Sequence, residues 1–116
     1  MNKSNLKLYN EFYNLYIYLY PILKRFPRSE KFSLRQEIDK TLLEIILIFD
    51  RFVKIKQSNR SSQLRKASYL FDRFKLLIRI SFDLGFIKQT HFILLMERYE
   101  VIGRMLGGLI KSETNN

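Results

Sequence analysis

The sequence predicts an all-helical protein, folded as an antiparallel up-and-down four-helix bundle in a single domain. Apolar residues recur along the 116-residue chain at spacings of three and four, the period of a helix that is buried on one face. The chain has only four glycines and two prolines, too few for the many tight turns of a β protein. Four periodic segments with short connections favour a bundle in which successive helices run antiparallel.

The first two helices are expected to meet at a corner that contains a proline. The first is predicted over residues 6–26, with a kink or break caused by Pro21 and an end imposed by Pro27. The second is predicted over residues 29–55. Ser29 is its expected N-cap, and the cap is partial because no acid stands three residues later.

The last two helices follow a polar connection. Residues 57–62 predict a loop, and the third helix is expected over residues 62–84, with Gly85 just beyond its end as the C′ residue. The fourth helix is expected over residues 88–111, which leaves residues 112–116 as a frayed tail.

The helices carry more apolar surface than one core can bury. The core faces of the second and third helices are predicted to include Leu34, Ile38, Leu42, Ile45, Phe49, Phe52, Leu64, Ala67, Leu70, Phe71, Phe74, Leu77, Ile78, Ser81 and Phe82. Five apolar side chains lie off these faces: Leu43, Leu47, Tyr69, Leu76 and Ile80. They are either scattered surface residues or an interface with a second copy or another protein.

Positive charge is the strongest feature of the composition. The 21 lysines and arginines exceed the 11 acids and give a net charge of +10, which favours a polyanionic partner. The candidate nucleic-acid-binding side chains on the third helix are Arg65, Lys66, Arg73, Lys75 and Arg79. Further cations, Lys24, Arg25, Arg28 and Lys31, crowd the corner between the first two helices.

These cations form no motif that reads base sequence, so binding is expected to be led by phosphate contacts and to be sensitive to salt. Tyrosines interleaved with them could stack on unpaired bases. The alternative is that the cations simply keep helix faces solvated.

Residues typical of catalysis are nearly absent. The chain has no cysteine and a single histidine, His91, and it lacks the phosphate-binding and zinc-protease motifs. We therefore expect no enzyme activity, no metal and no cofactor. The most apolar run, residues 42–49, is interrupted by Glu44 and is too short to span a membrane, so a cytoplasmic protein without a membrane partner is expected.

Gly103 and Gly107 form a G-x-x-x-G pattern. In a charged, non-membrane context this pattern indicates close backbone approach within or between bundles. Alternatively, the pair Gly107–Gly108 loosens the end of the fourth helix.

Segments along nearly the whole chain resemble Avd, the accessory variability determinant family of diversity-generating retroelements. The matching segments are residues 18–23, 26–34, 76–79 with 83–85, and 102–108 with 111–112. The piece at 26–34 also resembles the related four-helix-bundle family encoded by intervening sequences in bacterial 23S ribosomal RNA genes. Two positions depart from the Avd pattern: Leu109 stands where tryptophan is usual, and Asp39 where a basic residue is usual.

The resemblance implies a barrel-like homopentamer of four-helix bundles. It also implies a basic surface that binds nucleic acid and the element's reverse transcriptase, which copies a template RNA with adenine-directed errors. The family is required for this process without being a catalyst. By the family pattern Lys75 and Arg79 match basic positions of the third helix, and Arg104 matches the arginine of the glycine motif, where it either binds nucleic acid or pairs with a neighbouring protomer.

Two other functions stay open at this point. One is a ribosome-associated protein of the intervening-sequence family, against which the glycine motif at 103–108 argues. The other is a protein-interaction bundle whose charge serves solubility or an acidic protein partner.

Overall fold

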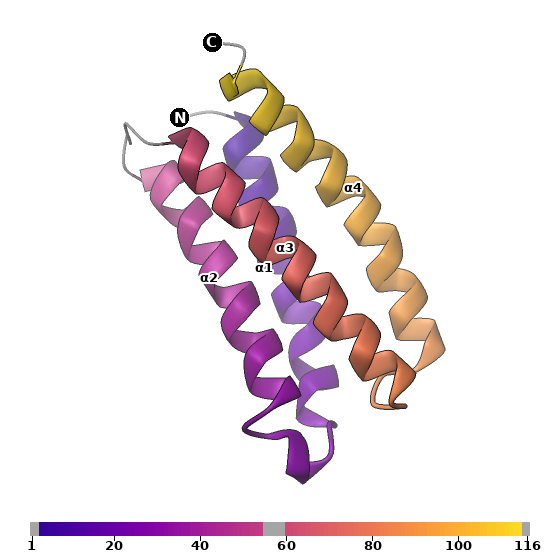
Figure 1. The fold of residues 1–116 in the computed structure, drawn as a ribbon. Coiled ribbons are helices and arrows are strands. Elements are labelled where there is room, and N and C mark those ends of the chain that lie inside the picture. Colours follow the sequence, from indigo (N-terminus) through magenta and orange to yellow (C-terminus); the bar gives the residue numbers. More distant parts are fainter. Residues whose placement is uncertain (1–2, 55–59, 115–116) are drawn as a thin grey trace.

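A computed structural model of the protein describes residues 3–54 and 60–114 and shows a four-helix bundle (Figure 1). The described residues form α1 (Lys3–Lys24), the short 3-10 helix η1 (Arg28–Glu30), α2 (Leu34–Lys54), α3 (Arg60–Asp83) and α4 (Gln89–Thr114), with no strand among them. Successive helices run in opposite directions, and α1 also packs against α4, so the four helices form a ring around one core. The predicted up-and-down bundle is confirmed.

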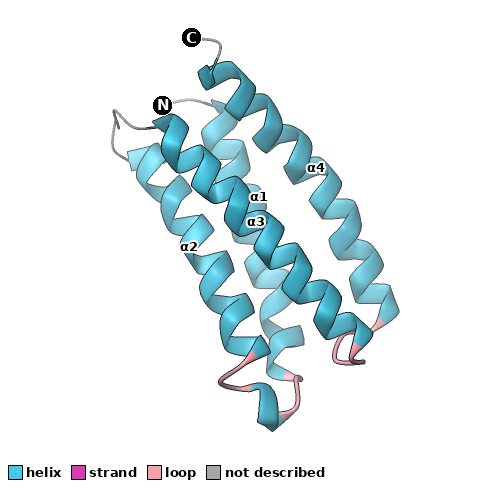
Figure 2. Ribbon diagram, viewed as in Figure 1, coloured by secondary structure: helices cyan, strands magenta, loops and turns pink. Residues whose placement is uncertain are grey.

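Short connections hold the bundle in register at the end far from the termini (Figure 2). The α3–α4 corner is a Schellman motif, in which Gly85 takes a φ of 85°. The Gly85 N–H donates to the Phe82 carbonyl and the Phe86 N–H to the Ser81 carbonyl, each at 2.9 Å. The predicted role of Gly85 is therefore confirmed.

The α1–α2 corner differs from the prediction. α2 begins at Leu34 and not at 29, because residues 28–30 form a 3-10 turn in which the Glu30 N–H donates to the Pro27 carbonyl at 2.9 Å. Ser33 takes the N-cap position predicted for Ser29, since its carbonyl accepts the first helical bond, from the Glu37 N–H. The predicted end at residue 55 lies outside the described residues.

α1 is continuous from Lys3 to Lys24, so it starts before the predicted residue 6, and of the kink or break predicted at Pro21 the break is excluded. Pro21 lies on the exposed side of the helix, as does Ile17, and water can therefore solvate the Ile17 carbonyl that the proline leaves unpaired. α1 ends at Lys24, two residues earlier than predicted. A tight turn follows through Phe26, just before Pro27.

The termini of α3 and α4 are also more helical than predicted. α3 begins at Arg60, inside the segment expected to be a loop, and α4 continues to Thr114, beyond the predicted end at 111. The Arg60 guanidinium lies 3.6 Å from the Glu113 carboxylate and 5.3 Å from the centre of the Phe52 ring. The start of α3 and the end of α4 therefore stabilise each other. The rest of the predicted loop, 57–59, and of the tail, 115–116, lies outside the described residues.

The core confirms the predicted faces of α2 and α3, of which only Leu34, Leu77 and Phe82 are half-buried. At its centre the Phe12 ring stacks on Phe49 and meets Phe71 edge-on, each at 5.5 Å between ring centres. Leu109, which departs from the Avd pattern, is buried in this core.

Candidate functional site

An apolar groove runs between α2 and α3 on the outside of the bundle. Three of the five predicted interface residues, Leu43, Leu47 and Tyr69, line it together with Glu37, Lys40, Thr41, Glu44, Leu70 and Arg73. Leu47 is 57% exposed and Tyr69 65% exposed, so neither is covered within one protomer. We call this set of residues the α2–α3 groove.

Leu76 and Ile80, the other two predicted interface residues, continue this apolar surface along α3. At 100° per residue they lie within about 20° of Tyr69 around the helix axis, and both are exposed. Tyr69, Leu76 and Ile80 therefore form one stripe along the outer face of α3, which we call the α3 stripe. The prediction that these residues lie off the core is confirmed.

Cations border the α3 stripe on both flanks. On the α2 side, Arg73 Nη2 lies 3.4 Å from Glu37 Oε1, and Lys66 Nζ lies 3.9 Å from Glu44 Oε1. These exposed cross-helix pairs contribute about 0–1 kcal/mol each to stability. They also reduce the positive charge that Lys66 and Arg73 present to an outside ligand.

The opposite flank of α3 carries Arg65, Lys75 and Arg79, in the single sector that the helical period predicts. Lys75 Nζ lies 3.4 Å from Asp72 Oδ1, and Arg79 Nε lies 3.2 Å from Asp83 Oδ1. Arg65 is exposed and has no ion pair with any described residue. Four of the five candidate cations on α3 are thus paired with an acid. The two pairs within α3 follow from spacings of three and four residues, whereas the two pairs with α2 depend on how the helices are aligned.

Arg104 stands apart from the α3 cations. It is exposed on α4 and lines a shallow groove with Lys7 and Glu11 of α1. Its neighbours Gly103 and Gly107 are exposed too, and a Cβ atom built on either would meet no atom within 4 Å. Close approach at these glycines within the bundle is therefore excluded, and α4 continues past the pair at 107–108 to Thr114.

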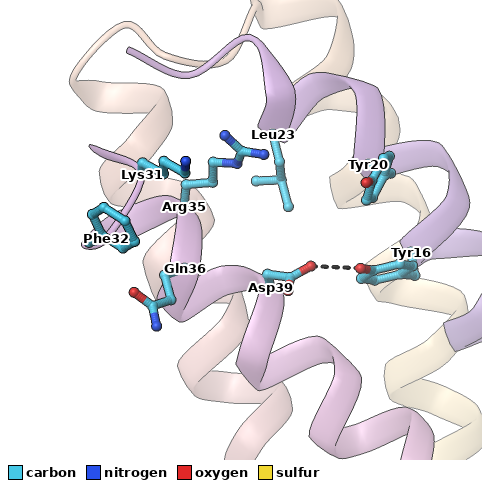
Figure 3. A pocket seen from close by; sticks show the side chains of 8 residues that line it. All are labelled: Tyr16, Tyr20, Leu23, Lys31, Phe32, Arg35, Gln36 and Asp39. Carbon is cyan, nitrogen blue, oxygen red and sulfur yellow. Dashed lines mark hydrogen bonds between the residues drawn. The ribbon is translucent and has the colours of Figure 1, made fainter. Parts of the chain in front are cut away.

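A pocket between α1 and α2 was not among the predicted sites (Figure 3). It is lined by Tyr16, Tyr20, Leu23, Lys31, Phe32, Arg35, Gln36 and Asp39, which we call the α1–α2 pocket. The spacing of Tyr16 from Tyr20, and of Lys31 from Arg35 and Asp39, in steps of four could have indicated it.

The Tyr16 hydroxyl donates a hydrogen bond of 2.7 Å to Asp39 Oδ1 across the α1–α2 pocket (Figure 3). Burial, then the hydrogen bond to Asp39 and the charge of its carboxylate, together raise the pKa of Tyr16 to about 12. Asp39 is the residue that departs from the basic Avd pattern on α2, and the structure gives its carboxylate a partner on α1.

A family model described as bAvd-like matches residues 6–113. The chain belongs to the bAvd-like family. This match covers every segment on which the resemblance to Avd rests, and it confirms that resemblance. Neither the curated proteins nor the solved structures give a match.

The bAvd-like family is a family of accessory proteins. In the described part of this bAvd-like protein no group of three or more His, Cys, Asp or Glu side chains could hold a metal ion. His91 lies edge-on to the Tyr18 ring at 6.0 Å between ring centres. Within residues 3–54 and 60–114, no helix combines the length and apolarity that crossing a membrane requires.

Proposed function

We propose that this bAvd-like protein is a non-enzymatic, cytoplasmic accessory protein of a diversity-generating retroelement. It binds the element's reverse transcriptase together with nucleic acid, the template RNA or its cDNA, and it assembles into a barrel-like homopentamer. The observation that carries the proposal is the α3 stripe, an exposed apolar surface that lies between two flanks of cations.

The apolar part of this surface supports binding to protein. Leu43 and Leu47 line the α2–α3 groove together with Tyr69, so exposed apolar side chains of α2 adjoin one end of the α3 stripe. Contiguous exposed patches of this kind mark protein interfaces. Gly103 and Gly107 add a second surface on α4 that lacks side chains and lets another backbone approach closely.

The charge supports binding to nucleic acid. Each protomer carries a net charge of +10, and closing several protomers into a ring would repeat their basic faces around one axis. An RNA that crosses several protomers binds more tightly than to one, because each further contact is intramolecular.

The mechanism that follows is scaffolding. Apolar contacts hold the polymerase, basic faces hold the template, and the local concentration of one near the other rises. No chemical step is assigned to the protein itself.

The test is co-purification of the tagged full-length chain with the element's reverse transcriptase and template RNA. The variant Lys75→Glu with Arg79→Glu is expected to keep the fold and to weaken RNA binding. Its matched control is Arg51→Glu with Lys54→Glu on α2, because both doubles change the net charge equally.

Recovery of a reverse transcriptase and one discrete RNA with the wild-type chain supports the proposal. Equal affinity for RNA in the two double variants would show that RNA binds a surface other than this face of α3. Recovery of an acidic protein and no RNA would favour a protein-interaction bundle, for which the paired state of Lys66, Arg73, Lys75 and Arg79 is the supporting observation.

A further inference from the structure

We propose that the α1–α2 pocket binds one unstacked base of a single-stranded nucleic acid, and that Lys31 and Arg35 hold the adjoining phosphate. The inference rests on the proposed binding of nucleic acid and adds a defined subsite to it. Two features of the corner support it: the concentration of cations without an acidic partner and the arrangement of aromatic rings beside them.

The unpaired positive charge of the protein concentrates at the α1–α2 corner. Residues 24–35 contain five cations, Lys24, Arg25, Arg28, Lys31 and Arg35, and one acid, Glu30. None of the five forms an ion pair with a described residue, whereas four of the five candidate cations on α3 do.

The two acids at this corner already have partners. Glu30 Oε1 accepts a 2.7 Å hydrogen bond from the Ser33 hydroxyl, and Asp39 accepts the bond from Tyr16. A phosphate approaching the corner therefore meets cations that no acid neutralises, and this favours the binding of an outside anion there.

Aromatic rings stand beside these cations. Figure 3 shows Tyr16 and Tyr20 projecting from α1, opposite Lys31, Phe32 and Arg35 on the other side of the pocket. The ring centres of Tyr16 and Tyr20 are 6.0 Å apart, and the bond to Asp39 fixes the Tyr16 ring in place. Tyr20 is 44% exposed and Phe32 81% exposed. Lys24 Nζ lies 5.0 Å from the centre of the Tyr20 ring and Lys31 Nζ 5.4 Å from that of the Phe32 ring, so a base would stack on the ring surface that these cations leave open.

Single-stranded nucleic acid fits this combination better than the other anionic partners do. Proteins that bind single strands combine cations along the backbone with aromatic rings on which bases stack. A duplex keeps its bases stacked inside and would use only the cations, and an acidic protein segment would likewise have no use for the rings. The pocket offers both kinds of contact within one site.

The experiment measures the affinity of the full-length chain for a short fluorescent uridine-rich RNA. Tyr20→Leu removes one ring of the pocket. Tyr13→Leu is its matched control, because Tyr13 is 49% exposed on the same helix and likewise contacts a tyrosine one turn earlier, but lies outside the pocket. We expect Tyr20→Leu to bind about fivefold more weakly, the lower end of the effect of losing one base–aromatic stack.

Three further measurements separate stacking from charge. An RNA with abasic residues should bind wild type and Tyr20→Leu equally. A 5-iodouracil-containing RNA should cross-link to Tyr20 or Phe32 on irradiation. Arg35→Gln should weaken binding more than Arg51→Gln, since both remove one positive charge from α2 but only Arg35, which is half-buried, lines the pocket.

Equal affinities of Tyr20→Leu and Tyr13→Leu, with salt-sensitive RNA binding retained, would overturn this inference and leave the proposed function standing. No RNA binding by the wild type even at low salt would overturn both. If Tyr20→Leu lost the reverse transcriptase and kept its RNA affinity, the pocket would belong to a protein partner and the inference would be wrong.

Discussion

Removing the hydroxyl of Tyr99 is expected to stabilise the protein. This hydroxyl is buried and has no hydrogen-bond partner among the described residues, and burial raises the pKa of Tyr99 far above its ordinary value. The ring meets Phe71 and Phe74 edge-on, at 5.7 and 6.0 Å between centres, and these contacts survive in Tyr99→Phe. An unsatisfied buried hydroxyl costs about 1–3 kcal/mol.

Because part of that cost is offset by the contacts that the oxygen atom makes, we expect Tyr99→Phe to raise the free energy of unfolding by about 1 kcal/mol. For a chain of this length that corresponds to a rise in Tm of about 4 °C. The assay is urea unfolding followed by circular dichroism, repeated at several protein concentrations so that self-association does not enter the comparison.

The control is the same atomic deletion at Tyr16, whose hydroxyl donates to the Asp39 carboxylate at 2.7 Å. Tyr16→Phe is expected to destabilise the protein by about 1–2 kcal/mol, because it removes a hydrogen bond to a charged acceptor. Opposite signs for the two variants would support the assignment. A loss of about 1 kcal/mol or more in Tyr99→Phe would refute it, since the hydroxyl must then be satisfied in solution by water or a second copy.

Three further changes test other parts of the structure. Leu47→Glu should leave the unfolding free energy within about 0.5 kcal/mol of wild type, as substitutions at exposed sites do, but light scattering should detect a smaller assembly. Ile17→Glu is the control, because Ile17 is about as exposed on α1 as Leu47 is on α2. An unchanged oligomer in Leu47→Glu would show that the α2–α3 groove is not part of the interface. Gly107→Ala should stabilise an isolated bundle by about 0.5–1 kcal/mol, and loss of the oligomer in this variant would show that another backbone packs on the glycine. The stability that Tyr16 derives from its bond to Asp39 should persist below pH 10 and disappear as pH rises through about 12, because the pKa of Tyr16 in the folded protein lies above its ordinary value of 10.0. The measurement is the free energy of unfolding of wild type and of Tyr16→Phe at pH 9 and at pH 11. The same difference between the two proteins at both pH values would contradict the prediction.

The sequence predicted the helices and their buried faces well because each face is a local property of one helix. The positions of Leu43, Leu47, Tyr69, Leu76 and Ile80 off the core follow from the helical period alone. Helix ends were predicted less well because they depend on contacts between segments. Arg60 is helical where a loop was expected, and the partners that hold it, Glu113 and Phe52, come from other helices.

The candidate site was predicted only in part, because it too depends on contacts between helices. Sequence reveals how many charges a helix carries, but the pairing of Arg73 with Glu37 and of Lys66 with Glu44 depends on how α2 and α3 are aligned. The α1–α2 pocket was missed because its two walls, at Tyr16 and Asp39, lie 23 residues apart and meet only when the corner closes. From the sequence alone Asp39 indicates only a loss of positive charge, because its partner Tyr16 lies on another helix.

The arrangement of α2 gives the scaffolding proposal a definite geometry. Arg35 and Asp39 line the pocket near the start of α2, and Leu43 and Leu47 line the groove further along the same helix, so the two surfaces follow one another along one rigid helix and share no residue. A strand held at the pocket and a protein held at the groove would therefore lie side by side without competing for the same residues. Under this proposal Tyr20→Leu should weaken RNA binding and spare the reverse transcriptase, Leu47→Glu should do the reverse, and the two effects should add in the double variant. Failure of additivity would mean that one ligand covers both the pocket and the groove.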